Sequence, residues 1–310
     1  MMKGYQGHSP LVPFDVVTPR PPVPPLPPLP PLSPVPGTLY VVATPLGNLQ
    51  DLSTRASTIL STVGVVASED TRRTGNLLAH LGVQPRVLSF HAHSGPKRLA
   101  TLLEILAGGR DVALVTDAGT PGVSDPGAEL VAAAREAGSP VVPIPGASAV
   151  ATALSASGLP ADRYLFLGFV PRKGTERSRL LARAAEAEWS VVLFEAPGRL
   201  ADLLRDLAAV AGDDRQAVVS RELTKLHEEV RAGSLRELGE YYSSKEPRGE
   251  ITVVLAGAGA PPEPPDRTEE ARARALALLA GGVTKREAAQ RLVVELGMAR
   301  NEAYRLVMEL

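Results

Sequence analysis

The sequence predicts an α/β protein with two α/β domains, a cleft between them, and a small helical domain at the C-terminus. Short aliphatic runs alternate with amphipathic stretches from residue 37 onward, which is typical of sheets that are largely parallel. The chain has 310 residues, enough for two modest domains. It is 44% hydrophobic and 22% charged, so it can bury a large core.

The first 36 residues form an extension that we exclude from the folded body. They hold 13 of the 29 prolines. Because proline fixes φ and removes a backbone donor, we expect residues 1–36 to be extended and disordered. The segment is either a dispensable tail or mistaken start, or a docking motif for a proline-binding domain. Its prolines exclude the apolar helix of a signal peptide, and no apolar run is long enough to span a bilayer, so we expect a cytoplasmic protein.

The first α/β domain is predicted over residues 37–157. Its buried strands are the aliphatic runs at 39–43, 64–68, 86–90, 112–116 and 141–144. Four stretches between them carry apolar residues at i, i+3, i+4 and i+7, and these predict helices: LSTRASTIL, TGNLLAHLG, KRLATLLEILAGG and GAELVAAAREAG. Because strands and helices alternate, this sheet should be largely parallel.

A second α/β domain is predicted over residues 158–258, and a helical domain over residues 266–310. Strands are expected at 164–169, 191–196, 217–223 and 250–257, with helices centred near Leu181, Leu204 and Leu238. The breaker run GAPPEPPD at 259–266 ends this domain. The last section should form a helix, a turn at Gly297 and a second helix opened by Asn301, similar to a helix-turn-helix.

Composition excludes several kinds of site. The absence of cysteine excludes a disulfide scaffold, a zinc ribbon, an iron–sulfur centre and a thiol nucleophile. We expect no metal site, and we assign His91 and His93 to a polar loop. No Walker-type phosphate loop is present, and no G-x-G-x-x-G follows the first strand, which disfavours a kinase, an ATPase or a standard nicotinamide dehydrogenase.

Four loops that follow predicted strands are rich in glycine and proline. They are ATPLGN at 43–48, DAGTPGVSDPGAE at 117–129, PGASA at 145–149 and FEAPGR at 194–199. Glycine permits positive φ and close approach of the backbone, while proline stiffens the loop. Open α/β sheets bind ligands beyond the carboxyl ends of their strands. The four loops together therefore predict a ligand held between the two domains.

These motifs, together with SEDTRRTGNLLAHLG, FLGFVPRKG, SRELTKLHEEVRAGSLREL and GEITVVLAG, carry a family resemblance over residues 37–310. In this order they resemble the ribosomal RNA small subunit methyltransferase I branch of the tetrapyrrole methylase superfamily. The resemblance implies two α/β domains of tetrapyrrole-methylase type, S-adenosyl-L-methionine in the cleft, and a homodimer. It also implies transfer of a methyl group to the ribose 2′-hydroxyl of a cytidine in the decoding region of small-subunit rRNA, as naked rRNA or as an assembled subunit.

The resemblance also assigns the cofactor contacts residue by residue. They fall on the strand-end loops and on the start of the last predicted strand: Pro45, Leu46, Gly47, Asp117, Ala118, Gly119, Val123, Ser124, Asp125, Ser148, Ala149, Phe194, Glu195, Ala196, Gly249, Glu250 and Ile251. Ser124 and Asp125 have an alternative role, as caps of the helix that begins near Pro126.

Methyl transfer from a sulfonium to a hydroxyl requires alignment of the two reactants and removal of the hydroxyl proton. The candidate catalytic residues are Glu69, Asp70, Glu195, Glu222 and Lys225. The carboxylates could act as the general base, while Lys225, or an arginine such as Arg72, could stabilise the developing alkoxide. Alternatively, Glu69 and Asp70 are a charge pair at a helix N-terminus that interacts with Arg72 and Arg73.

The net charge of −1 excludes a general basic coat, so an RNA partner must be met by local patches. Two basic runs could flank the cleft and contact phosphates. Their residues are Arg72, Arg73, Arg86, Lys97 and Arg98 in the first, and Arg172, Lys173, Arg177, Arg179 and Arg183 in the second. The alternative is that both are solvated helix faces.

The last section leaves two further alternatives open. Its charge is close to neutral, so it could contact RNA or only support packing or the dimer. The competing classes for the whole chain are a ligand-sensing DNA-binding regulator and a methylase that acts on a tetrapyrrole or another small molecule. The regulator would retain DNA without methyl transfer, and a small-molecule methylase would not need the basic runs.

Overall fold

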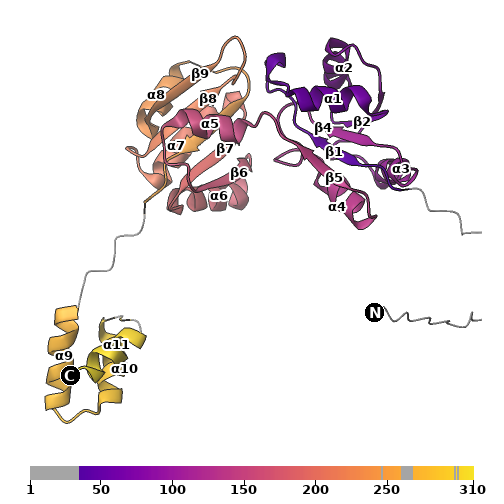
Figure 1. The fold of residues 1–310 in the computed structure, drawn as a ribbon. Helices are drawn as coiled ribbons and strands as arrows, with labels where there is room; N and C mark the ends of the chain where they lie inside the picture. Colours follow the sequence, from indigo (N-terminus) through magenta and orange to yellow (C-terminus); the bar gives the residue numbers. More distant parts are fainter. Residues whose placement is uncertain (1–34, 246, 260–267, 297, 299) are drawn as a thin grey trace, which may run out of the picture.

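The computed structural model of the chain describes residues 35–245, 247–259, 268–296, 298 and 300–310. Almost all of the predicted proline-rich extension, most of the breaker run at 259–266, and the predicted turn at Gly297 lie outside these residues. Within them the chain forms two α/β domains and a separate group of three helices, which confirms the predicted fold class (Figure 1).

The first domain is built on a five-stranded sheet in which every pair of neighbouring strands is parallel. The strand order is β3-β2-β4-β1-β5. The strands are β1 (Leu39–Val42), β2 (Val65–Ser68), β3 (Arg86–Ser89), β4 (Val112–Val115) and β5 (Val141–Ile144). Parallel neighbours need crossover connections, and helices make these crossovers. All five strands that the sequence predicts for this domain are present.

Helices cover both faces of the first sheet. On one face α1 (Thr54–Thr62) and α2 (Thr71–His80) pack against β-strand residues such as Val66 and Ala113. On the other face α3 (Pro96–Ala107) and α4 (Ala128–Glu136) pack against Leu39 and Leu114. A sheet buried on both sides explains why its strands appear in the sequence as continuous aliphatic runs.

The second domain contains a mixed sheet of order β6-β7-β10-β8-β9. Its strands are β6 (Tyr164–Phe169), β7 (Ser190–Glu195), β8 (Gln216–Arg221), β9 (Glu229–Ser234) and β10 (Ile251–Leu255). β6 and β7 are parallel, and the other pairs are antiparallel. The sequence analysis missed β9, which is an edge strand. An ion pair between Arg221 of β8 and Glu229 of β9 joins the two strands.

Helices α6 (Gly174–Glu186), α7 (Leu200–Ala211) and α8 (Leu235–Ser244) form one hydrophobic core with one face of this sheet. The opposite face is covered by α5 (Ala149–Ser157), whose Val150, Ala153 and Leu154 pack with Val192 and Val254. We expected α5 to close the first domain. Its packing places it with the second sheet, so the chain crosses between the domains just before α5.

The last helices are α9 (Thr268–Ala280), α10 (Lys285–Leu296) and α11 (Arg300–Met308). They bury a core of small residues, including Ala271, Ala275, Ala288 and Ala303, which lets the helices approach closely. Two short 3₁₀ helices lie elsewhere, η1 (Leu49–Asp51) and η2 (Pro197–Arg199). No described helix combines the length and the apolar character needed to cross a lipid bilayer.

Candidate functional site

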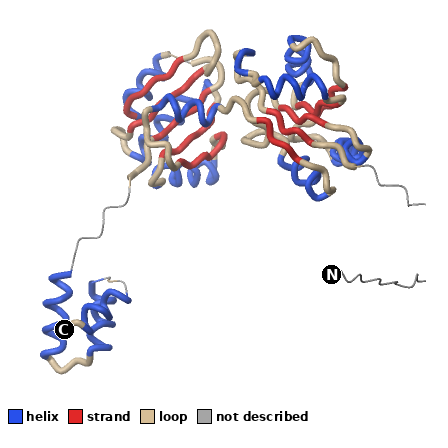
Figure 2. The backbone as a smooth tube through the Cα atoms, in the orientation of Figure 1, coloured by secondary structure: helices blue, strands red, loops and turns tan. Residues whose placement is uncertain are grey.

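A cavity of about 460 Å³ is lined by residues of both α/β domains. The first domain contributes the loops after β1, β2, β4 and β5, and these loops lie on the side that faces the second domain (Figure 2). The second domain contributes the ends of β6 and β7 and the start of β10. The size suits a cofactor or a small substrate.

Strand order brings the loops of the first domain together. β4, β1 and β5 are neighbours, so the loops at their carboxyl ends meet at one edge. Thr44 and Gly119 exchange two backbone hydrogen bonds of 2.9 and 3.0 Å. The Thr120 hydroxyl donates to the Ala147 carbonyl at 3.2 Å, which joins the third loop. Gly119 has a φ of +82°, a conformation that a side chain would strain.

The loop between β4 and α4 owes its shape to several residues with positive φ. Gly122 and Gly127 have values of +80° and +137°, and Ser124 adopts +64° although it is not glycine. Helix α4 begins at Ala128, and its N-cap is Gly127, without a capping side chain. The alternative role of Ser124 and Asp125 as caps of this helix is therefore wrong. Both side chains line the cavity instead.

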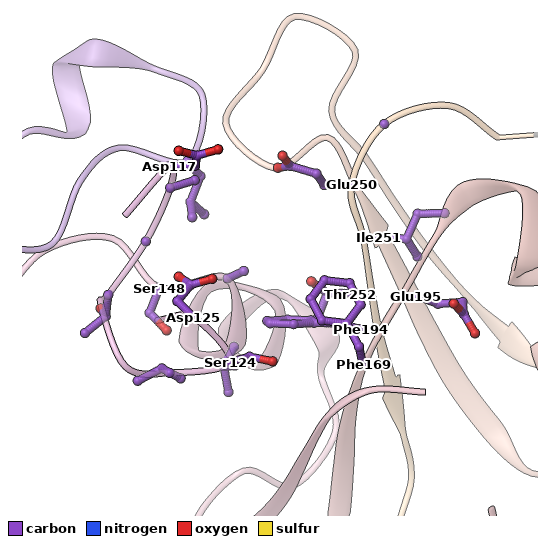
Figure 3. Close-up of a pocket in the computed structure, with 18 of the residues that line it drawn as sticks. Asp117, Ser124, Asp125, Ser148, Phe169, Phe194, Glu195, Glu250, Ile251 and Thr252 are labelled. Atoms are coloured by element: carbon purple, nitrogen blue, oxygen red, sulfur yellow. The ribbon is translucent and has the colours of Figure 1, made fainter. Parts of the chain in front are cut away.

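The second domain supplies an apolar wall. The rings of Phe169 and Phe194 lie 5.4 Å apart, edge to face, and Phe166 packs behind Phe194 at 5.0 Å. Figure 3 shows Phe169 and Phe194 at the side of the cavity opposite Ser148 and Asp125. Gly168 has a φ of +66°, and the register between β6 and β7 shifts beside it. Phe169 follows this shift, and its side chain borders the cavity and is 58% exposed.

The polar part of the cavity is acidic. Its carboxylates are Glu69, Asp117, Asp125 and Glu250, and Arg73 lies 3.5 Å from Asp117. Burial raises the pKa of Glu69, and the neighbouring charge of Asp117 adds to this rise. Burial also raises the pKa of Asp125, to about 6. A cationic ligand would gain from this field, whereas a phosphate would be repelled.

Most of the expected cofactor contacts lie at this cavity. All of them except Pro45 and Gly47 line it, and these two border a smaller adjoining cavity of about 200 Å³. The sequence analysis did not assign Thr120, Val150, Phe169, Pro197 and Thr252, which also line the main cavity. The motif FLGFVPRKG contains Phe169, but nothing in the motif indicates that this ring lies at the cavity, next to a glycine with positive φ.

The candidate catalytic residues separate into two groups. Glu69 alone among them faces the cavity with an accessible carboxylate, and its Oε2 accepts a 3.5 Å hydrogen bond from the Asp117 amide. Asp70 caps α2, because its carboxylate accepts a 2.8 Å hydrogen bond from the backbone N–H of Arg72. The Arg72 side chain also binds this carboxylate, which lowers the pKa of Asp70. Asp70 therefore fits the alternative interpretation, in which it belongs to a charge pair at the N-terminus of a helix.

Glu195 is directed away from the cavity, behind strand β7 (Figure 3). Its side chain is fully buried and forms ion pairs with Arg199 and Arg177. Arg177 also binds Asp206, with 2.7 Å between Nη2 and Oδ2. A buried carboxylate between two guanidinium groups holds the end of β7 in place, because removing one partner would leave a buried charge unpaired. Glu195 contributes backbone, not an accessible carboxylate, to the cavity.

Glu222 and Lys225 belong to the loop between β8 and β9 of the second domain, which contacts the first domain beside the cavity residue Glu250. Lys225 Nζ lies 2.9 Å from Glu222 Oε1 and 3.1 Å from Glu250 Oε2. Although burial opposes it, these contacts raise the pKa of Lys225, and the lysine lowers the pKa of Glu222. The stem of Lys225 fills the space where Gly47 of the first domain would carry a Cβ. The Asn48 amide donates to Thr224 Oγ1 at 3.2 Å.

The basic runs are not single surfaces. Arg72, Arg73, Lys97, Arg98, Arg172 and Lys173 lie just after β2, β3 or β6, at the carboxyl edge of each sheet. Arg86 begins β3, and Arg183 lies in the last turn of α6, so both are at the opposite edge. Arg177 is buried in the pair with Glu195 and Asp206. In the described part of the chain no group of three or more metal-ligating side chains occurs.

We predict that Gly47→Ala destabilises the protein by about 1–3 kcal/mol, because the new methyl group overlaps the stem of Lys225. In a Lys225→Ala background the same change should cost much less. Urea denaturation of the four proteins measures this coupling. Gly64→Ala is the matched control, since nothing lies within 4 Å of its Cβ position. Equal costs in both backgrounds would contradict the contact.

The fold agrees with what comparison with known proteins finds. The family model for Tetrapyrrole (Corrin/Porphyrin) Methylases matches residues 38–239. Two solved structures share the fold: a uroporphyrin-III-C-methyltransferase from Thermus thermophilus (TM-score 0.52, 23% identity, covering 70% of this chain and 94% of that one) and a cobalt precorrin-4 methyltransferase (TM-score 0.56, 20% identity, covering 71% and 94%).

Curated relatives are more similar in sequence. A protein from Synechocystis sp. named ribosomal RNA small subunit methyltransferase I is 44% identical over 274 residues, which cover 88% of this chain and 98% of that one. Its namesake from Thermotoga maritima is 42% identical over 221 residues, covering 71% and 99%. These matches confirm the resemblance predicted from the motifs. The chain belongs to the tetrapyrrole methylase family and, within it, to the ribosomal RNA small subunit methyltransferase I group.

Proposed function

We propose that this protein is an S-adenosylmethionine-dependent methyltransferase that methylates the ribose 2′-hydroxyl of a cytidine in small-subunit rRNA. The observation that carries the proposal is the cavity between the two α/β domains, which is acidic on one side and aromatic on the other. It occurs in a chain that is 44% identical to a relative named as an rRNA methyltransferase.

The residues present fit this cofactor. S-adenosylmethionine carries a purine, a ribose, an amino-acid end and a sulfonium, but no phosphate. The backbone of Ala118 and the hydroxyl of Ser148 offer hydrogen bonds, while Phe194 offers an apolar surface. Bound there, the cofactor would supply a methyl group on a positively charged sulfur.

Glu69 is the residue we assign as the general base. It follows β2 at the cavity, and burial raises its pKa toward the range in which a carboxylate accepts a proton effectively. Its carboxylate would take the proton of the ribose hydroxyl as that oxygen attacks. Lys225 is already engaged by Glu222 and Glu250, so we assign it to holding the two domains together beside the cavity.

The RNA backbone would contact the basic residues at the carboxyl edges of the sheets. Arg72, Lys97 and Arg172 represent the three positions, after β2, β3 and β6 respectively. Arg72 forms an ion pair with Asp70, but this pair lies at an exposed site, where ion pairs are weak. A phosphate could therefore replace Asp70 as its partner. The homodimer, the cytoplasmic location and the use of an assembled subunit as acceptor remain predictions.

The function is tested by following a labelled methyl group. The protein is incubated with methyl-labelled S-adenosylmethionine and, separately, with small ribosomal subunits, naked rRNA, DNA and a tetrapyrrole. We expect label on the 2′-hydroxyl of one cytidine in the small-subunit rRNA, located by nuclease digestion and mass spectrometry. Label on the tetrapyrrole alone, or retention of DNA without any methyl transfer, would favour one of the competing functions.

Glu69→Gln should lower the turnover number by roughly 10²–10⁴-fold, because the amide cannot accept the hydroxyl proton. Cofactor affinity, measured by isothermal titration calorimetry, should change little. Asp70→Asn is the comparison variant, since Asp70 caps α2 and makes no part of the cavity wall. An unchanged turnover number for Glu69→Gln would remove Glu69 as the base.

Charge reversal at the carboxyl edges should weaken RNA binding and flatten its salt dependence. Lys97→Glu with Arg98→Glu should reduce the slope of log K against log salt by about 1–2, as expected for one or two lost phosphate contacts. The matched control is Arg110→Glu with Arg135→Glu, two exposed positions just before β4 and at the end of α4, on the opposite edge. Identical slopes in both double variants would contradict the proposed RNA surface.

A further inference from the structure

The acidic side of the cavity contains one carboxylate that neither the fold nor the proposed reaction uses. Asp117 has Arg73 at 3.5 Å, and Glu250 has Lys225 at 3.1 Å. Glu69 is the base in the proposed reaction. Asp125 has no ion pair with any described residue, although it lines the cavity. An unpaired carboxylate in a partly buried site is costly, which calls for an explanation.

The backbone holds Asp125 in this position at a cost. Ser124 adopts a φ of +64° and Gly127 a φ of +137°, on either side of Asp125 and Pro126. Non-glycine residues with positive φ are uncommon and are retained where the surrounding structure requires them. Figure 3 shows the Asp125 carboxylate directed into the cavity, near Ser148 and across from Phe194. The loop therefore presents this carboxylate to whatever occupies the cavity.

A second buried polar group lies beside it. Thr116, the residue after β4, is 2% exposed, and its hydroxyl has no hydrogen-bond partner of good geometry among the described residues. The hydroxyl nevertheless favours the charged form of Asp125. A buried hydroxyl and an unpaired carboxylate thus lie side by side. Buried polar groups normally have hydrogen-bond partners, so this pair calls for an explanation, and a ligand in the cavity would supply one.

Asp125 also responds to its electrostatic surroundings. Burial raises the pKa of its carboxyl to about 6, and the charges of Glu69, Asp117 and Glu250 add to the rise. Among the described residues, Arg73 is the basic residue that lines the cavity, and it pairs with Asp117. A new positive charge in the cavity would therefore lower the proton affinity of Asp125, and its removal would restore it.

We propose that Asp125 is the residue by which the cavity distinguishes the positively charged methyl donor from its neutral product, S-adenosylhomocysteine. This rests on the proposed function. When the methyl group leaves, the sulfur keeps the bonding electron pair and becomes a neutral thioether, while the hydroxyl proton passes to the base. A sulfonium beside Asp125 would stabilise the ionised carboxylate, whereas a neutral thioether would not. The carboxylate thus favours the donor and does not hold the product.

The sign and the size of the effect follow from this charge change. Near pH 5 about a tenth of a carboxyl group with a pKa of about 6 is ionised, and near pH 7.5 almost all of it is ionised. If the donor binds the ionised form and the product binds both, the ratio of their affinities should rise about tenfold across this range. Any other ionisation that affects both ligands equally cancels in the ratio.

The experiment measures this ratio by isothermal titration calorimetry on the full chain between about pH 5 and pH 7.5. The ligands are S-adenosylmethionine, S-adenosylhomocysteine and sinefungin, which carries an ammonium in place of the methylated sulfur. We expect the methyl donor and sinefungin to gain about tenfold in affinity as pH rises, and the product to gain less than about twofold. Near pH 6 binding of the donor should also release a proton, seen as a dependence on the buffer's ionisation enthalpy.

Three variants locate the effect. Asp125→Asn should give a ratio that is independent of pH, while it still binds S-adenosylhomocysteine, which shows that the cavity is intact. Asp117→Asn should keep the pH dependence but shift its midpoint to lower pH, because one neighbouring negative charge is lost. Asp162→Asn, an exposed carboxylate in the loop before β6, is the matched control and should behave as the wild type.

The wild-type profile decides the proposal even if Asp125→Asn fails to fold. A ratio that does not change with pH, or one that changes equally in Asp125→Asn, would overturn the role of Asp125 while leaving the proposed function intact. Failure of the wild-type protein to bind either adenosyl ligand at any pH would instead overturn the proposed function.

Discussion

The backbone pairing between the loops after β1 and β4 is the constraint on which the site depends. Thr44 and Gly119 are joined by two hydrogen bonds and form an isolated antiparallel bridge beyond the ends of the parallel strands β1 and β4. This pairing is possible because β1 and β4 are parallel neighbours and because Gly119 accepts a φ of +82°. The pairing holds the two loops together, and residues of both loops line the cavity.

The second domain completes the cavity from a sheet of different construction. Antiparallel pairing sets Ile251 opposite Glu195, so the start of β10 lies beside the end of β7 and both reach the cavity. The buried pairs of Glu195 with Arg177 and Arg199 fix this end of β7 from behind. Contacts of Lys225 and Thr224 with the loop at Gly47 and Asn48 then join the two domains.

The sequence was sufficient to predict the fold and the loops, but not the roles of individual charged residues. Buried parallel strands and loops with glycine and proline leave local patterns, so β1 to β5 and the loop at 117–127 could be placed. Arg177 and Glu195 look like an RNA contact and a catalytic residue in the sequence. They pair with each other because α6 packs on the sheet, and this long-range contact has no local signature. The edge strand β9 was missed because its residues are mostly polar.

The distribution of charge explains how a nearly neutral protein can serve both a cationic cofactor and a polyanion. Glu69, Asp117, Asp125 and Glu250 make the cavity negative, and this field would repel an RNA phosphate. Exposed basic residues such as Arg72, Lys97 and Arg172 follow β2, β3 and β6 at the carboxyl edges of the same sheets, outside the cavity. If RNA phosphates bind these residues, as proposed above, a sugar and its base would be the parts of the RNA directed toward the cavity. Under the proposed function, opposite charges at the centre and the edge would favour attack by a ribose hydroxyl and keep the RNA phosphates out of the cavity.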